Sequence, residues 1–119
     1  MDIPEELRHR IDNLLEWYRN GNIPASTAAI NSIHEIVGAG MPSAIRYLLS
    51  TAPKSVLKGT GKYLNKLKTW NFLICADIGI GVEEAKKKSL ARQPLYQEVY
   101  QMFFDLKNSP QVTPENNEA

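Results

Sequence analysis

The residues with the clearest chemical potential lie between positions 54 and 68, in the stretch KSVLKGTGKYLNKLK. This stretch contains five lysines and no acidic residue: Lys54, Lys58, Lys62, Lys66 and Lys68. The first four of these are four residues apart, so on a helix they would share one stripe, with Lys68 lying off it. A row of ammonium groups suits an anionic partner, and we predict that these lysines bind a nucleic acid or a nucleotide.

The surroundings of this stretch support the same prediction. No acidic residue occurs between Glu35 and Asp77, and the interval carries six basic residues, which give it a charge of +6. A solvated helix face usually mixes both signs, because like charges four residues apart repel each other. Tyr63 and Trp70 lie close by, and their rings suit stacking on unpaired bases. The whole chain has a net charge of only +1, so a merely solvated face is the alternative.

The segment GTGK, at positions 59–62, has the composition of a turn that precedes a helix. At such a turn, free backbone N–H groups and the helix dipole can hold an anion. We therefore predict a helix that begins at Gly61 and is capped by Thr60; both residues are candidates for the anion site, and a plain helix cap between two segments is the simpler explanation. The nucleotide-binding loop Gly-x4-Gly-Lys-Ser/Thr does not fit, because Val56 and Tyr63 occupy the positions of its first glycine and its hydroxyl residue.

A second basic cluster consists of the three lysines at 86–88 and Arg92. Glu83 and Glu84 stand just before it, and carboxylates four residues from lysines on a helix can neutralise much of this charge. Whether the cluster extends the first basic surface depends on how the chain folds.

The histidines offer little for catalysis. His9 lies between two arginines, an unfavourable setting for a general base. His34 is next to Glu35, but neighbours in sequence point in different directions on a helix. No spacing of histidines, cysteines and carboxylates fits a metal site, and no serine or cysteine has an evident base partner. We therefore expect a non-enzymatic binding protein without catalytic residues, metal or cofactor.

An aromatic face near the end of the chain gives an alternative function. Tyr96, Tyr100 and Phe104 are four residues apart and lie beside the apolar face that contains Val99 and Phe103. A helix that is apolar over this much of its circumference is either central in the fold or docked on a partner. The alternative is therefore a protein-interaction module, adaptor-like or self-associating, that uses the Tyr96, Tyr100 and Phe104 face; central packing is the simpler explanation.

Hydrophobic periodicity and turn residues divide the chain into short helices. Gly59 and Gly61 argue against one unbroken helix through the lysine stretch, since each costs about 1 kcal/mol relative to alanine. The segment 72–80 has strand propensity, but an isolated strand has nothing to pair with, so we favour helix. The predicted helices cover about 4–19, 24–37, 41–52, 61–76, 82–92 and 94–107.

Composition completes the expectation. The 119 residues, 43% of them hydrophobic, are enough for one packed core. Cys75 is the only cysteine, lies in an apolar run and is expected to be a buried, inert thiol. No apolar stretch approaches the length of a membrane span, so we expect a cytoplasmic protein with no membrane contact. The sequence thus predicts an all-α, single-domain bundle of five or six short helices over 1–108, followed by a disordered tail at 109–119.

Overall fold

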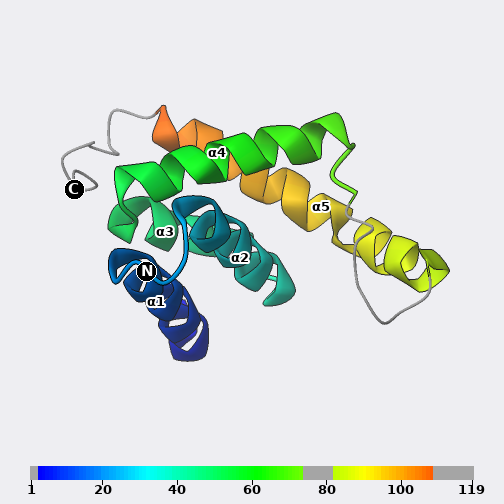
Figure 1. Ribbon diagram of the computed structural model, residues 1–119. Helices are drawn as coiled ribbons and strands as arrows, with labels where there is room; N and C mark the ends of the chain where they lie inside the picture. The colour runs from blue at the N-terminus through cyan, green and yellow to red at the C-terminus, as the bar shows by residue number, and fades with distance from the viewer. Residues whose placement is uncertain (1–2, 74–81, 109–119) are drawn as a thin grey trace.

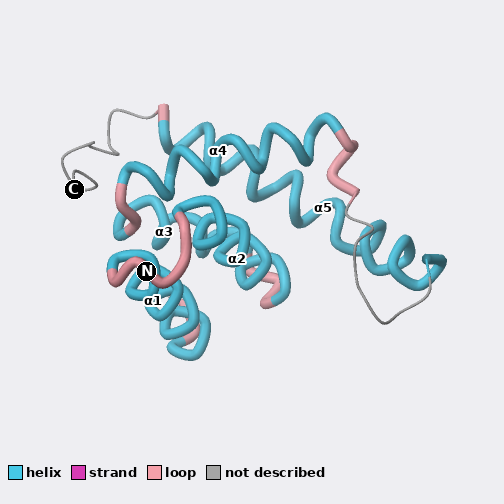
Figure 2. The backbone as a smooth tube through the Cα atoms, in the orientation of Figure 1, coloured by secondary structure: helices cyan, strands magenta, loops and turns pink. Residues whose placement is uncertain are grey.

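The computed structural model describes residues 3–73 and 82–108. Within these ranges the fold is an all-α bundle, as predicted, and Figure 2 shows helices joined by short loops. The predictions for Cys75, for residues 74–80 and for the tail at 109–119 lie outside the described residues. The elements are α1 (Glu5–Arg19), α2 (Ala25–Gly38), the short 3-10 helix η1 (Pro42–Ala44), α3 (Ile45–Thr51), α4 (Lys54–Thr69) and α5 (Val82–Lys107).

Helix α2 is the central element of the bundle. It contacts α1 on one side and α4 on the other, and it also touches α5 (Figure 1). The turn between α1 and α2 contains Gly21, whose φ of +80° is the left-handed conformation that glycine adopts readily. The core is formed by buried side chains from these four helices and from α3, among them Leu7, Ile11, Leu15, Ala29, Ile33, Ile36, Ile45, Leu48, Val56, Leu64, Leu67, Tyr96, Val99 and Phe103.

Helix α4 runs without interruption through the glycine-rich segment, so the predicted turn before Gly61 is wrong. A β-carbon placed on Gly59 would lie 3.3 Å from the β-carbon of Ala29, which shows how closely α4 approaches α2. A β-carbon on Gly61 would lie 3.5 Å from the ring of Phe103 in α5. Gly59 therefore allows α2 to pack closely against α4, and this packing offsets its low helix propensity, whereas the contact at Gly61 is an ordinary one.

Thr60 does not cap a helix, because it lies in the middle of α4. Its side chain is fully buried, and its hydroxyl donates a hydrogen bond of 2.8 Å to the carbonyl oxygen of Val56. This is the back-bonding that a threonine hydroxyl makes to the preceding turn inside a helix. Thr60 thus satisfies its own buried hydroxyl and has no free donor for an anion.

Helix α5 is one helix of 26 residues, although Pro94 suggested two helices that meet there. Proline removes one backbone N–H and leaves the carbonyl one turn earlier, at Leu90, without its usual donor. Leu90 is 54% exposed and Pro94 is also exposed, so water can reach this position on the helix surface. Solvation of the carbonyl lowers the cost of the proline and lets the helix continue.

Ser32 of α2 gives a test of the packing between helices. It is fully buried, and its hydroxyl has no hydrogen-bond partner within the described part of the chain. We expect Ser32→Ala to raise the free energy of unfolding by about 1 kcal/mol, because it removes a buried, unpaired hydroxyl. Urea unfolding measures this change, with Ser26→Ala, an exposed serine of the same helix, reporting the gain in helix propensity alone. A Ser32→Ala protein no more stable than Ser26→Ala would contradict the unpaired hydroxyl.

Candidate functional site

An unbroken α4 places its lysines along one exposed ridge. We call Lys54, Lys58, Lys62 and Lys66 the lysine crest; all of them are exposed. Each step of four residues turns about 40° around a helix axis, so the crest winds gradually and spans roughly 18 Å from end to end. Trp70 follows at the same spacing as the residue that caps the C-terminus of α4, and it is 54% exposed. The opposite side of α4 is buried in the core.

The crest is poor in compensating negative charge. The ion pairs among the described residues all involve α1, which is bridged to itself and to Glu35 of α2. Within this part of the chain, Lys58 and Lys62 form no ion pair. The end of α1 meets the start of α4, where the hydroxyls of Tyr18 and Ser55 are hydrogen-bonded, and α2 lies between α1 and the rest of α4 (Figure 1). From Lys58 to Lys66 the crest is therefore a positive surface that no ion pair with a described residue neutralises.

Lys66 and Lys68 differ in direction near the end of α4. The ammonium nitrogen of Lys66 is 5.9 Å from the ring centre of Trp70, so this lysine points along the crest towards Trp70. That of Lys68 is 5.1 Å from the ring centre of Tyr100 and 3.5 Å from its hydroxyl oxygen. Lys68 therefore reaches across to α5 and lies off the crest, as its spacing predicts.

Three other residues of the predicted anion site lie away from the crest. Thr60 and Gly61 are buried inside α4, so they are not part of an exposed anion site. Tyr63 is half-buried and turned towards α2, where its hydroxyl lies 2.8 Å from Nε2 of His34 and the two rings stack. Of the two aromatic residues predicted to stack on bases, Trp70 is therefore the exposed one.

The aromatic face of α5 is largely used inside the fold. Tyr96 is only 2% exposed and has an edge contact with His34. The ring centre of Tyr100 is 5.6 Å from that of Phe72 and 4.8 Å from that of Phe104. Tyr100 and Phe104 are half-buried. A partner that used all of this face would have to draw Tyr96 out of the core, so the geometry favours a packing role for these rings.

A groove lies where the end of α4 meets α5, with a volume of about 490 Å³. Asn71 and Phe72 have φ values of 57° and 59°, and this unusual turn brings Phe72 back against Tyr100. Sequence reasoning missed the groove, because it forms only where one polar face of α5 packs beside the end of α4, and the two segments are distant in the chain. Its lining residues are Lys68, Phe72, Pro94, Gln97, Glu98, Tyr100 and Gln101.

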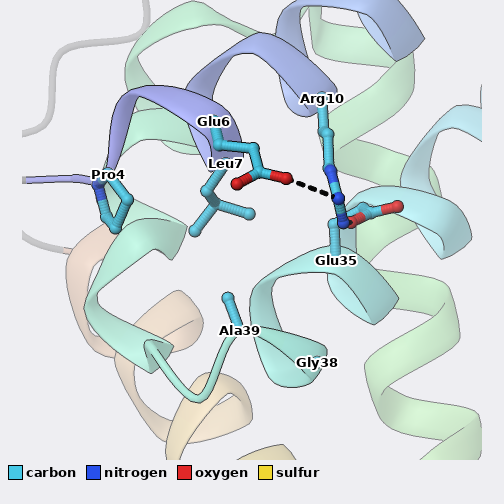
Figure 3. Close-up of a pocket in the computed structure, with 7 residues that line it drawn as sticks. All are labelled: Pro4, Glu6, Leu7, Arg10, Glu35, Gly38 and Ala39. Carbon is cyan, nitrogen blue, oxygen red and sulfur yellow. Dashed lines mark hydrogen bonds and ion pairs between the residues drawn. The ribbon is translucent and has the colours of Figure 1, made fainter.

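A second pocket, of about 330 Å³, lies between the start of α1 and the end of α2 (Figure 3). Arg10 crosses it and donates hydrogen bonds of 2.7 Å to Glu6 and 3.1 Å to Glu35. The hydrogen bond and charge of Glu35, with the charge of Glu6, raise the pKa of Arg10 above its ordinary value. Since two carboxylates already surround this guanidinium, the pocket is not suited to an anion, and we assign it a role in joining α1 to α2.

Two other classes of feature are absent from the part of the chain that the structure describes. It holds no group of three or more histidines, cysteines or acidic residues placed to bind a metal ion. None of its helices is both long and apolar enough to cross a membrane. Comparisons with models of known protein families, with curated proteins and with solved structures found no match.

One buried tyrosine and two half-buried tyrosines are expected to make the free energy of unfolding fall at alkaline pH. Burial raises the pKa of Tyr63 and Tyr96 above the ordinary value of 10.0, and burial with a hydrogen bond to Asp12 raises the pKa of Tyr47 to about 12. Above about pH 10 the unfolded chain loses these protons while the folded protein keeps them. We therefore expect the contribution of these tyrosines to the free energy of unfolding to be constant below about pH 10 and to decrease as the pH rises further. The measurement is the urea concentration at the midpoint of unfolding, compared at about pH 9 and about pH 11.

Tyr63→Phe is the informative variant for this pH dependence. It removes one titrating group, so the slope of unfolding free energy against pH should become shallower by at most about 1.4 kcal/mol per pH unit. The exposed Trp17, changed to Phe, is the control and should leave the slope as it is. Equal slopes for Tyr63→Phe and the wild type would show that Tyr63 is not protected from ionisation.

Proposed function

We propose that this protein is a non-enzymatic nucleic-acid-binding protein that uses the lysine crest of α4. The observation that carries the proposal is the run of four exposed lysines on one continuous helix, extended by the exposed ring of Trp70. Like charges four residues apart destabilise a helix by a few tenths of a kcal/mol per pair. Because the crest costs stability, its charge is better explained by an anionic partner, whose phosphates would replace the repulsion with attraction.

The side chains of the crest favour phosphate contacts over reading of base edges. Base-edge recognition in a duplex groove combines arginine or lysine on guanine with asparagine or glutamine on adenine, and the crest presents lysines alone. Lysine acts as a point charge towards phosphate and positions the strand without selecting its sequence. Trp70 adds an exposed aromatic surface at one end, on which an unpaired base can stack. We therefore favour a single strand as the ligand.

Fluorescence anisotropy tests the proposal directly. Labelled single-stranded RNA and DNA, and a duplex of equal charge, are titrated with the protein at about 50 and about 200 mM salt. Four phosphate contacts on a single strand predict an affinity roughly 50-fold weaker at the higher salt. The single strands should bind more tightly than the duplex. An absence of binding at the lower salt concentration would overturn the proposed function.

A further inference from the structure

Three polar groups from α4 and α5 meet at the edge of the groove. The ammonium of Lys68 is 3.5 Å from the hydroxyl oxygen of Tyr100, which is 3.3 Å from Oδ1 of Asn65. Lys68 and Asn65 are exposed, and Tyr100 is half-exposed. Both contacts are long for hydrogen bonds, so these groups can turn towards a ligand at little cost. An ammonium, a phenol hydroxyl and a side-chain amide are donors that commonly contact phosphate oxygens.

The open groove beside this cluster has the volume of a small-molecule site, with a largely polar lining. Its volume of about 490 Å³ lies within the usual range of roughly 300 to 1,000 Å³ for ligand pockets. The half-exposed ring of Tyr100 gives it aromatic surface, with the buried ring of Phe72 at its base, and α5 supplies the carboxylate of Glu98 and the amides of Gln97 and Gln101. The position of Phe72 depends on two successive left-handed residues, a conformation that costs energy and often accompanies a functional site.

We infer that this groove binds one nucleotide of the single strand that lies on the lysine crest, an inference that rests on the proposed function. The phosphate is held by Lys68, the hydroxyl of Tyr100 and the amide of Asn65. The base leaves its stack and enters the groove against Phe72 and Tyr100. A base paired within a duplex cannot do this without being extruded, so the groove gives the protein its preference for single strands.

The polar lining also specifies which bases fit. The carboxylate of Glu98 can accept a hydrogen bond from the exocyclic amine of cytosine or adenine, whereas the amides of Gln97 and Gln101 both donate and accept and can pair with any base. Uracil has a carbonyl oxygen where cytosine and adenine carry the amine, and that oxygen is repelled by the carboxylate of Glu98. The groove therefore selects adenine or cytosine over uracil.

Anisotropy titrations with labelled oligo(A), oligo(C) and oligo(U) of about 12 nucleotides test this selection. We expect oligo(A) and oligo(C) to bind about tenfold more tightly than oligo(U). Glu98→Gln keeps the shape of the side chain but removes the charge, and it should reduce the preference to less than about threefold. Glu84→Gln makes the same change at an exposed position at the start of α5 and should leave the preference unaltered. The double variant Lys68→Ala/Tyr100→Phe should lower the affinity for every single strand and leave the affinity for the duplex unchanged.

The outcomes separate this inference from the proposed function. Equal affinity for the three oligonucleotides, or a preference that survives Glu98→Gln, would overturn the nucleotide groove. Salt-dependent binding that persists in that case leaves the crest as the binding surface. If the wild type binds none of the strands, the proposed function fails and the groove inference fails with it. Titration of the wild type with adenosine monophosphate and with inorganic phosphate, followed by amide NMR, should shift Phe72 and Gln97 only with the nucleotide; equal shifts with both would contradict a base site.

Discussion

Lys58→Glu/Lys62→Glu/Lys66→Glu is expected to weaken binding to single-stranded nucleic acid by at least about 100-fold at about 0.1 M salt. Each phosphate contact on a single strand contributes about 0.7 log units at this salt concentration through counterion release, so losing three contacts gives about two log units. Reversal of charge adds repulsion to this loss. The measurement is the anisotropy titration, and the slope of log affinity against log salt should also fall by about two.

The matched control for this variant is Lys86→Glu/Lys87→Glu/Lys88→Glu. It reverses the same number of exposed lysines and changes the net charge equally, but it lies at the start of α5. We expect it to change the affinity by no more than several-fold, through the overall field of the protein. Since all six side chains are exposed, both variants should keep the circular dichroism and melting temperature of the wild type. Equal losses in the two variants would show that net charge, rather than the crest, governs binding.

The helices built on a regular apolar stripe could be predicted from the sequence. Leu7, Ile11 and Leu15 recur at helical spacing in α1, and all of them are buried. The breaks were harder to predict, because glycine and proline act locally while their compensation is tertiary. Gly59 is tolerated because α2 lies against it, and Pro94 because its surroundings are exposed to water. Neither condition is visible in the local sequence, so α4 was predicted to begin at Gly61 instead of Lys54, and α5 was predicted as two helices instead of one.

The candidate site also contains one part that the sequence indicates and one part that depends on tertiary packing. The spacing of the four crest lysines could be read from the sequence, but their continuous row could not, because Gly59 and Gly61 predicted a break in the helix that carries them. The cluster of Asn65, Lys68 and Tyr100 joins residues more than thirty positions apart, and only the packing of α4 on α5 brings them together. Tyr63 is the reverse case: it is close to the lysines in sequence, but in the fold it faces α2 and its hydroxyl is hydrogen-bonded to His34. Proximity along a helix therefore says little about which side a residue occupies.

Close packing beneath α4 also has a consequence for the crest above it. The repulsion among the lysines works against the helix, so the contacts of its buried side must hold it in place. Gly59 is central to these contacts: a β-carbon there would lie 3.6 Å from the carbonyl oxygen of Ala25 and from the α-carbon of Ser26. Both are backbone atoms of α2, which cannot move aside as the end of a flexible side chain can. The spacing between α2 and α4 is thus set by the absence of a side chain at this position.

Gly59→Leu is therefore expected to lower the free energy of unfolding by about 3 kcal/mol or more, because the side chain would push α4 away from α2. Urea unfolding followed by circular dichroism measures the loss. Gly61→Ala is the matched control: its new methyl group would meet Phe103 at an ordinary contact distance of 3.5 Å. That variant should gain up to about 1 kcal/mol from helix propensity. A Gly59→Leu protein as stable as the wild type would mean that α4 is not held this closely against α2, and the support that the packing gives to the lysine crest would have to come from elsewhere.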